Sequence, residues 1–161
     1  MKKNQKIVLA SRPAAWVEES NFRLEEDDIP QPGINQVLVR NHWLSLDPYM
    51  RGRMADAKSY AKPVAIGEVM IGGTAGEVVQ SNHPDFAPGD KVVGALGWQL
   101  FGVADGGVLQ KVDPSVIHLS AWLGPVGMPG VTAWIGLFDI CAPKPGDTVV
   151  VTAASGAVGS V

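Results

Sequence analysis

The feature that most constrains this chain is a glycine-spaced segment that directly follows a run of β-branched residues. Residues 148–152 read TVVVT, a composition typical of a strand buried on both faces, as in a parallel sheet. Residues 153–161 continue as AASGAVGSV, which is the spacing A-x-G-x-x-G with Ala154 in place of the first glycine. Directly after a predicted strand, this spacing indicates the phosphate-binding turn of a dinucleotide-binding domain.

The two glycines of this segment suit such a turn for different reasons. Gly156 lets the backbone approach a pyrophosphate closely, and Gly159 lets the following helix pack against the strand. The helix N-terminus offers N–H groups and a positive dipole to the phosphates. The alternative interpretation is a glycine-rich turn without a ligand. We expect the helix, the second strand and the ribose-selecting residue that would complete the motif to lie beyond residue 161.

The first 120 residues show a different pattern, of short strands separated by turn signals. Strands are expected at 5–10, 36–46, 69–80, 91–94, 98–103 and 108–112. Glycines at 72, 73 and 76 predict a bend or bulge in the third of these strands. The polar residues 13–34, with the acidic run 25–28, are expected to be a solvated loop. Many short strands of this kind favour a mainly β, partly open antiparallel barrel.

Two helices are expected. Asp47 and Pro48 break the second strand and suit the cap and the first position of a short helix over 49–54, with a loop at 60–69. Apolar residues at Val131, Trp134, Ile135 and Phe138 have helical spacing, and the proline-rich turn 143–147 ends that helix. Because the pattern changes from all-β to helix, strand and glycine turn, we place a domain boundary between residues 121 and 122.

Composition excludes several classes of protein. The net charge of −3 gives no basic field for a nucleic acid, so no such partner is expected. The four apolar or small residues 7–10 are too few for a signal-peptide core or a membrane span. The single cysteine, Cys141, forms no internal disulfide and fits a reducing, cytoplasmic protein. His42, His83 and His118 are scattered, so we expect no metal site.

Several motifs then identify a family. They are LSLDPYMRGRM at 44–54, GGTAGEVV at 72–79, GMPGVTA at 127–133 and the terminal glycine turn. In this order they resemble the zinc-free branch of the medium-chain dehydrogenase/reductase superfamily that contains prostaglandin reductases (leukotriene B4 12-hydroxydehydrogenases) and NADPH-dependent curcumin reductases. The resemblance extends over essentially the whole chain.

The resemblance implies a GroES-like catalytic domain over 1–121 followed, over 122–161, by the truncated start of a Rossmann domain. This chain would then be the N-terminal part of an enzyme, inactive alone and lacking a closing piece of its first domain. The implied reaction is reduction by NADPH of the carbon–carbon double bond of an α,β-unsaturated ketone or aldehyde, with hydride delivered to the β-carbon. A homodimer is expected by analogy. Alternatives are a quinone oxidoreductase or, for this chain alone, a non-catalytic binding or assembly module.

The resemblance also places candidate site residues. Tyr60 matches a substrate-contacting tyrosine, and its phenol would hydrogen-bond the enone or enolate oxygen; the alternative is an exposed loop tyrosine. Tyr49 and Trp98 are candidates for the walls of the substrate cleft, with packing as the alternative. Arg51 is a candidate for an acidic substrate tail, with a surface or structural role as the alternative. We expect the cofactor to contact Met128, Thr132, Ala154, Gly156, Ala157, Val158 and Gly159.

Overall fold

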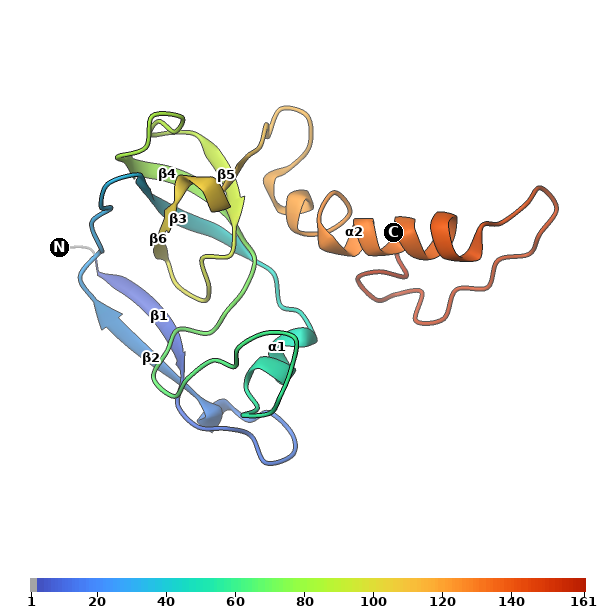
Figure 1. Ribbon diagram of the computed structural model, residues 1–161, viewed down its shortest axis with the longest axis horizontal. Coiled ribbons are helices and arrows are strands. Elements are labelled where there is room, and N and C mark those ends of the chain that lie inside the picture. Colours follow the sequence, from blue (N-terminus) through green and yellow to red (C-terminus); the bar gives the residue numbers. More distant parts are fainter. Residues whose placement is uncertain (1–2) are drawn as a thin grey trace.

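The computed structural model describes residues 3–161 and consists of a β-rich body from which a helix extends to one side (Figure 1). The strands are β1 (Asn4–Leu9), β2 (Phe22–Asp27), β3 (Gln36–Leu44), β4 (Thr74–Ser81), β5 (Lys91–Gly94), β6 (Phe101–Asp105) and β7 (Gln110–Lys111). The helices are α1 (Tyr49–Arg53), α2 (Met128–Trp134), the 3-10 helices η1 (Glu19–Asn21), η2 (Gly106–Val108) and η3 (Leu119–Leu123), and the π-helix η4 (Ile135–Cys141).

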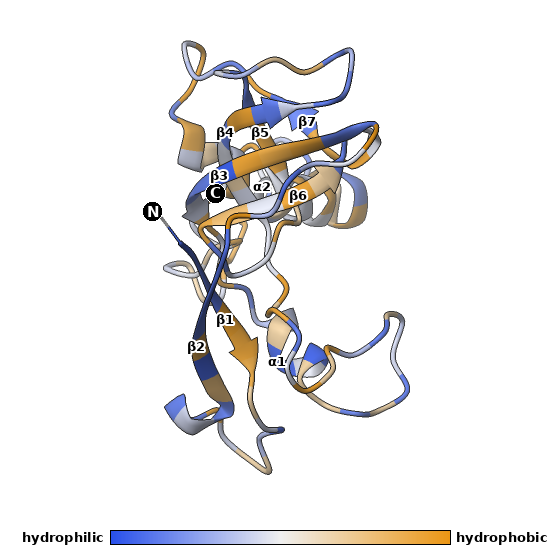
Figure 2. Ribbon diagram, turned by 90° about the vertical axis from the view of Figure 1, so that its left-hand side faces the viewer, coloured by the Kyte–Doolittle hydropathy of each residue, from blue (hydrophilic) through white to orange (hydrophobic). Residues whose placement is uncertain are grey.

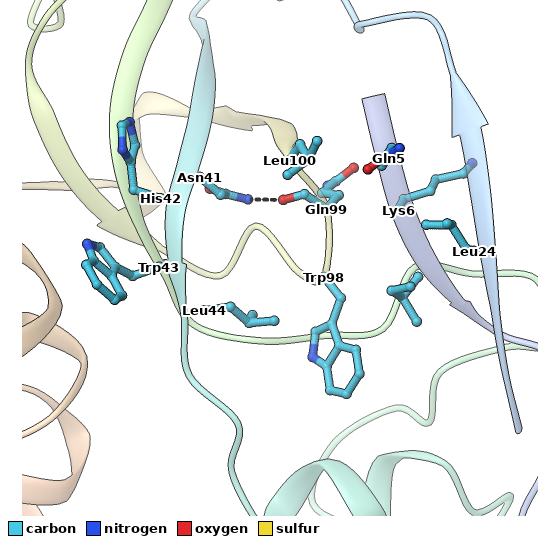
Figure 3. A pocket seen from close by; sticks show the side chains of 11 residues that line it. Gln5, Lys6, Leu24, Asn41, His42, Trp43, Leu44, Trp98, Gln99 and Leu100 are labelled. Atoms are coloured by element: carbon cyan, nitrogen blue, oxygen red, sulfur yellow. Dashed lines mark hydrogen bonds between the residues drawn. The ribbon is translucent and has the colours of Figure 1, made fainter. Parts of the chain in front are cut away.

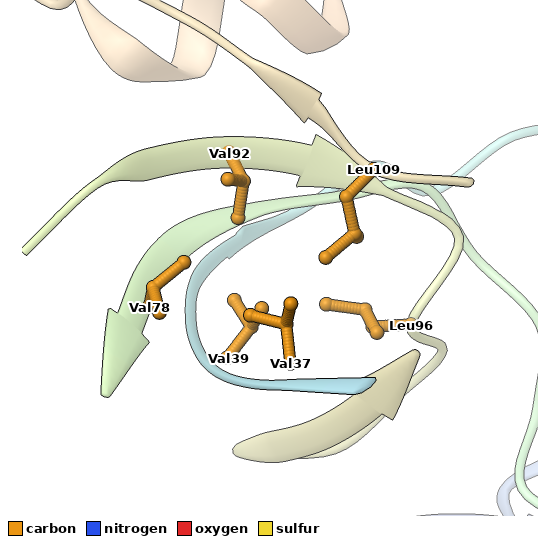
Figure 4. Packing of buried hydrophobic residues seen from close by; sticks show 6 residues of the cluster. All are labelled: Val37, Val39, Val78, Val92, Leu96 and Leu109. Atoms are coloured by element: carbon orange, nitrogen blue, oxygen red, sulfur yellow. The ribbon is translucent and has the colours of Figure 1, made fainter. Parts of the chain in front are cut away.

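Five strands form one antiparallel sheet in the order β6-β3-β4-β5-β7. The register between β3 and β4 shifts at Leu38/Val39 and again between Asn41 and Trp43, and such bulges bend a sheet. The sheet curls around side chains that point toward one another in Figure 4, namely Val37, Val39, Val78, Val92, Leu96 and Leu109. Burial of each contributes about 1.5–3 kcal/mol. The expected mainly β domain is confirmed.

Several strands are shorter than expected. The strand expected from residue 69 begins at Thr74, because residues 69–73 run as an irregular segment with Gly72 packed against Leu44 and Trp98. The strand expected at 98–103 lies at Phe101–Asp105, and the one expected at 108–112 is reduced to Gln110–Lys111. These differences change the boundaries of the strands but not their order.

The expectation of a loop at 13–34 is wrong for residues 19–27. β2 pairs with β1 from Asn4↔Asp27 to Leu9↔Phe22, so residues 25–27 of the acidic run are part of this hairpin. Lys6 Nζ lies 2.5 Å from the Asp27 carboxylate and 3.5 Å from that of Glu25. Opposite charges on facing strands stabilise a hairpin. Three of the acidic side chains of 25–28 are therefore paired with Lys3 and Lys6, which are distant in sequence.

A second apolar cluster holds the hairpin against α1 and the loop that follows it. Leu9, Met54, Val64 and Met70 are buried together, and Phe22 stacks on Trp98 with ring centroids 5.4 Å apart. In Figure 2 the hairpin and α1 lie side by side below the five-stranded sheet. This cluster therefore fixes the position of α1 relative to the barrel.

The start of α1 differs from the expectation in one detail. Pro48 is the N-cap residue, and the Asp47 side chain makes no capping hydrogen bond. The Asp47 carbonyl instead accepts a hydrogen bond from the Met50 N–H at 3.1 Å. Pro48 adopts helical backbone angles, and the Asp47 carboxylate accepts no hydrogen bond from the first turn of the helix.

The C-terminal part is a helix followed by a chain that folds back along it (Figure 1). The expected helix is confirmed as α2 and η4, but the strand expected at 148–152 is not formed. A strand needs a neighbouring strand for its backbone hydrogen bonds, and no other strand of residues 3–161 lies beside this run. Val149, Val150 and Val151 are consequently exposed. In the described chain, no helix is long and apolar enough to cross a membrane.

Candidate active site

A pocket of about 250 Å³ lies where α1 and the loop after it meet η3 and the start of α2. Two predicted substrate residues, Tyr49 and Tyr60, line it together with the predicted cofactor residue Met128. The rest of the lining was not predicted as site residues and consists of Ser45, Asp47, Gly73, Trp122 and Leu123. Three aromatic rings and a carboxylate therefore share one small pocket.

The two tyrosines differ in environment. Tyr60 lies on the loop after α1 and is 86% exposed. Tyr49 opens α1 and is partly buried. Burial raises the pKa of the Tyr49 phenol above its ordinary value, and the negative charge of Asp47 raises this pKa further, while Arg53 acts in the opposite direction. Tyr49 therefore stays protonated over the physiological range and can donate a hydrogen bond.

A second cavity, of about 630 Å³, adjoins the first and lies between α2, η4 and the glycine turn. Met128 and Asp47 line both cavities. Thr132 is one helical turn after Met128, and its hydroxyl donates a hydrogen bond to the Met128 carbonyl at 2.7 Å. The predicted cofactor residues brought together here are Met128, Thr132, Gly156, Ala157, Val158 and Gly159, whereas Ala154 is not part of the lining.

The glycines of this turn have close backbone neighbours. A Cβ atom on Gly159 would lie 2.5 Å from the Ala153 carbonyl oxygen, and one on Gly156 would lie 3.1 Å from the same atom. Ala153 itself adopts a positive φ of 51°. The turn is thus too tight for a side chain at Gly159.

The cofactor-side cavity is lined mainly by apolar groups such as Leu137 and Val149, and its lining residues include no lysine or arginine among positions 3–161. An uncharged ring such as a reduced nicotinamide fits this lining, whereas phosphates need cations or free N–H groups. The residues present therefore fit the reactive end of a nicotinamide cofactor better than its phosphates.

A hydrogen-bonded turn fixes the start of α2 relative to η3. The Gly127 and Gly130 N–H groups both donate to the Gly124 carbonyl, at 2.9 and 3.2 Å. A Cβ on Gly130 would collide with the Pro125 carbonyl oxygen, so the backbone packs too closely for any side chain. The GMPG sequence thus holds Trp122 and Met128, at the two ends of the turn, in one pocket.

Arg51 and Trp98 lie outside the tyrosine pocket. The Arg51 guanidinium donates a hydrogen bond to the Ala15 carbonyl at 3.0 Å and a longer one to the Pro13 carbonyl at 3.5 Å. Trp98 lines a separate pocket of about 320 Å³ between the hairpin and the barrel (Figure 3). Both residues also line a cavity of about 330 Å³ on the other side of α1. Their predicted substrate contacts remain predictions.

Trp122 and Asp47 are two of the five lining residues that sequence reasoning missed. Trp122 offered no functional signal except its position five residues before GMPG. The sequence suggested only a helix cap for Asp47, although its place within the LSLDPYMRGRM motif could have indicated a site. Within residues 3–161 no group of three or more histidine, cysteine, aspartate or glutamate side chains could hold a metal ion.

Comparison with known proteins places this arrangement in a family. A family model described as the N-terminal domain of oxidoreductase matches residues 5–112. The NADPH-dependent curcumin reductase of Escherichia coli is 54% identical over 158 residues, which are 98% of this chain and 46% of that protein. Prostaglandin reductase 1 of Rattus norvegicus is 43% identical over 146 residues, covering 89% of this chain and 42% of the rat protein.

A solved structure agrees with these sequence matches. The structure of CurA in complex with NADPH from Vibrio vulnificus has a TM-score of 0.90 and 52% identity, and the match covers 97% of this chain and 46% of that one. The chain therefore spans about half the length of the curated relatives it matches. It belongs to the family of oxidoreductase N-terminal domains, in the curcumin reductase and prostaglandin reductase branch of the medium-chain dehydrogenases/reductases.

Proposed function

We propose that the whole protein reduces the carbon–carbon double bond of α,β-unsaturated ketones or aldehydes with NADPH. The observation that carries this proposal is the junction of two cavities at Asp47 and Met128, one lined by phenols and the other by α2 and the glycine turn. Relatives named as NADPH-dependent curcumin reductase and as NADP-dependent 2-alkenal reductase support it. When bound, the nicotinamide cofactor supplies the hydride.

The role of this chain is to bind, orient and stabilise. The Tyr60 phenol donates a hydrogen bond to the carbonyl oxygen of the substrate, which becomes enolate-like as the β-carbon is reduced. Tyr49, protonated for the reasons given above, lines the same pocket as Trp122 and Met128 and packs with them against the substrate. The α-carbon then takes a proton. Loss of one donor to a developing oxyanion typically costs on the order of 10²–10³ in rate.

The organisation of the chain completes the proposal. We assign residues 1–121 to a GroES-like catalytic domain and residues 122–161 to the linker helix and the opening of a Rossmann domain, so that 148–152 becomes a strand when neighbouring strands are present. We also propose a homodimer that works in the cytoplasm.

The test is Tyr60→Phe in the complete enzyme, assayed with enones at steady state. We expect kcat/KM to fall by roughly 10². Lys62→Gln, on the same exposed loop, is the control and should keep the full rate. An unchanged rate for Tyr60→Phe would remove Tyr60 from the mechanism. Reduction of quinones without reduction of enones would instead identify a quinone oxidoreductase.

A further inference from the structure

The N-terminal end of η3 is capped by a histidine side chain. His118 is the N-cap residue, and its Nδ1 atom accepts a hydrogen bond from the Ser120 N–H at 3.4 Å. The Ser120 hydroxyl lies 2.8 Å from the same nitrogen. Because Nδ1 accepts from an N–H group, it also accepts from this hydroxyl, and the ring proton lies on Nε2. One ring nitrogen thus receives both contacts from the first turn of η3.

η3 is held on the barrel at both of its ends. At the start, the ring of His118 meets that of Trp43 on β3 edge to face, with centroids 5.5 Å apart and an angle of 74° between the ring planes. Leu119, the first residue of η3, is buried. At the end, Leu123 lies against Gly73, where an added Cβ would be 3.7 Å from a Leu123 methyl group. His118 is therefore part of the contact that fixes the start of this helix.

η3 also forms one side of the tyrosine pocket. Trp122 and Leu123 line the pocket directly. The Ala121 carbonyl accepts a hydrogen bond from the Gly124 N–H at 3.0 Å, so the turn that leads to α2 continues from the same helix. Met128, at the start of α2, is a third lining residue. A displacement of η3 would therefore move three lining residues together.

We propose that His118 is a positioning residue that holds η3, and with it Trp122, in place for the substrate. The His118 side chain lines neither the tyrosine pocket nor the adjoining cavity, so it acts through the helix. The first N–H groups of a helix have no partner within it, and loss of the capping acceptor weakens the first turn. This inference rests on the proposed function, since it concerns binding of the substrate in the same pocket.

The same local arrangement occurs at His83, away from the pocket. Its Nδ1 accepts a hydrogen bond from the Asp85 N–H at 3.2 Å, and its ring meets that of Phe86 edge to face with centroids 5.3 Å apart. His83 lies in the segment between β4 and β5 and lines neither cavity. A substitution of His83 removes an equivalent hydrogen bond without touching η3, so it is the matched control.

The experiment uses three variants of the complete enzyme. His118→Phe keeps a ring against Trp43 but has no acceptor, whereas His118→Asn loses the ring and keeps an oxygen that can cap the helix. With 4-phenylbut-3-en-2-one as the enone, we expect His118→Phe to raise KM about fivefold, the usual effect of losing a cap, and to change kcat by less than about twofold. In His118→Asn and in the control His83→Phe, KM should stay within about twofold of the unmodified value.

A purely structural role of His118 predicts a different pattern. A loss of folded enzyme lowers the apparent kcat and leaves KM unchanged, and this result in His118→Phe would overturn the proposal. An equal rise of KM in His118→Asn and His118→Phe would also overturn it, because the capping acceptor would then not be the feature that matters.

Binding of the saturated ketone 4-phenylbutan-2-one, measured by calorimetry, separates this proposal from the proposed function. This binding requires the pocket but no hydride transfer. If the unmodified enzyme does not reduce the enone, the proposed function fails. A dissociation constant for the ketone that rises about fivefold in His118→Phe but not in His118→Asn would still support the role of His118, and equal dissociation constants in all variants would contradict it.

Discussion

The Asn4 side chain forms hydrogen bonds in both directions with the backbone of Phe101. Its Oδ1 accepts from the Phe101 N–H at 2.9 Å, and its Nδ2 donates to the Phe101 carbonyl at 2.9 Å. Asn4 is 3% exposed, and Nδ2 also donates to the Gln99 side chain at 3.2 Å. These hydrogen bonds therefore connect β1, and with it the β1–β2 hairpin, to the start of β6.

We expect Asn4→Ala to lower the free energy of unfolding by about 2 kcal/mol, because buried backbone groups of Phe101 lose their partner. Denaturant titration of the variant gives this difference. Gln5→Ala is the control, since the Gln5 amide donates to Glu26 at an exposed site, and its effect should stay under about 0.5 kcal/mol. Equal losses of unfolding free energy in Asn4→Ala and Gln5→Ala would show that the hydrogen bonds of Asn4 do not stabilise the hairpin.

Gly76→Ala should destabilise the barrel. A Cβ at Gly76 would collide with the Arg40 carbonyl oxygen and lie 2.9 Å from a methyl group of Val39 on the neighbouring strand β3. Overpacking of this kind costs about 1–3 kcal/mol. The matched control is Gly52→Ala on α1, where no atom lies within 4 Å of the added Cβ. We expect this control to gain about 0.5 kcal/mol, and thermal unfolding of both variants distinguishes the two sites.

The Glu77–Lys91 ion pair predicts a pH dependence of stability. Lys91 Nζ lies 2.6 Å from the Glu77 carboxylate, and this hydrogen bond lowers the pKa of Glu77 below its ordinary value of 4.5. A lowered carboxyl pKa in the folded state contributes stability above the unfolded pKa, and this stability is lost as pH falls through the folded pKa. Because the Glu77 side chain is 36% exposed, the contribution is less than about 1 kcal/mol.

Glu77→Gln should therefore be less stable than the unmodified protein at pH 7, with the difference vanishing in acid below the folded pKa. Chemical denaturation of both proteins at a series of pH values measures this difference in unfolding free energy. A difference that stays constant from pH 7 to pH 3 would show that the ion pair is not its source.

The 161-residue chain alone should bind NADPH very weakly or not at all. Among its described residues, no lysine or arginine lines the cavity beside the glycine turn, so phosphate groups find no cationic partner there. Titration with NADPH, followed by cofactor fluorescence or calorimetry, checks this. Micromolar affinity would contradict the expectation and would show that the turn at 153–161 suffices to hold the phosphates.

The sequence by itself determined the local features, because they depend on near neighbours. Most of the barrel strands were predicted along the chain from short β-rich segments and turn residues, and the helix after GMPG follows from its apolar spacing. Tyr49, Tyr60 and Met128 were predicted from motifs, and the structure brings these three together in one pocket. The phosphate-binding role of the glycine turn was predicted from spacing and stays a prediction, while a Cβ at Gly159 would lie 2.5 Å from the Ala153 carbonyl oxygen.

Only the tertiary structure decided features that depend on partners distant in sequence. Residues 25–27 of the acidic run belong to strand β2, which pairs with β1 and places Lys6 beside the carboxylates. The run at 148–152 is irregular because no other strand of residues 3–161 lies beside it. The Asp47 side chain makes no capping hydrogen bond and is instead part of three cavity linings. The sequence specifies which hydrogen bonds and ion pairs a side chain is able to form. The packing of the whole chain determines which partner lies close enough to form them.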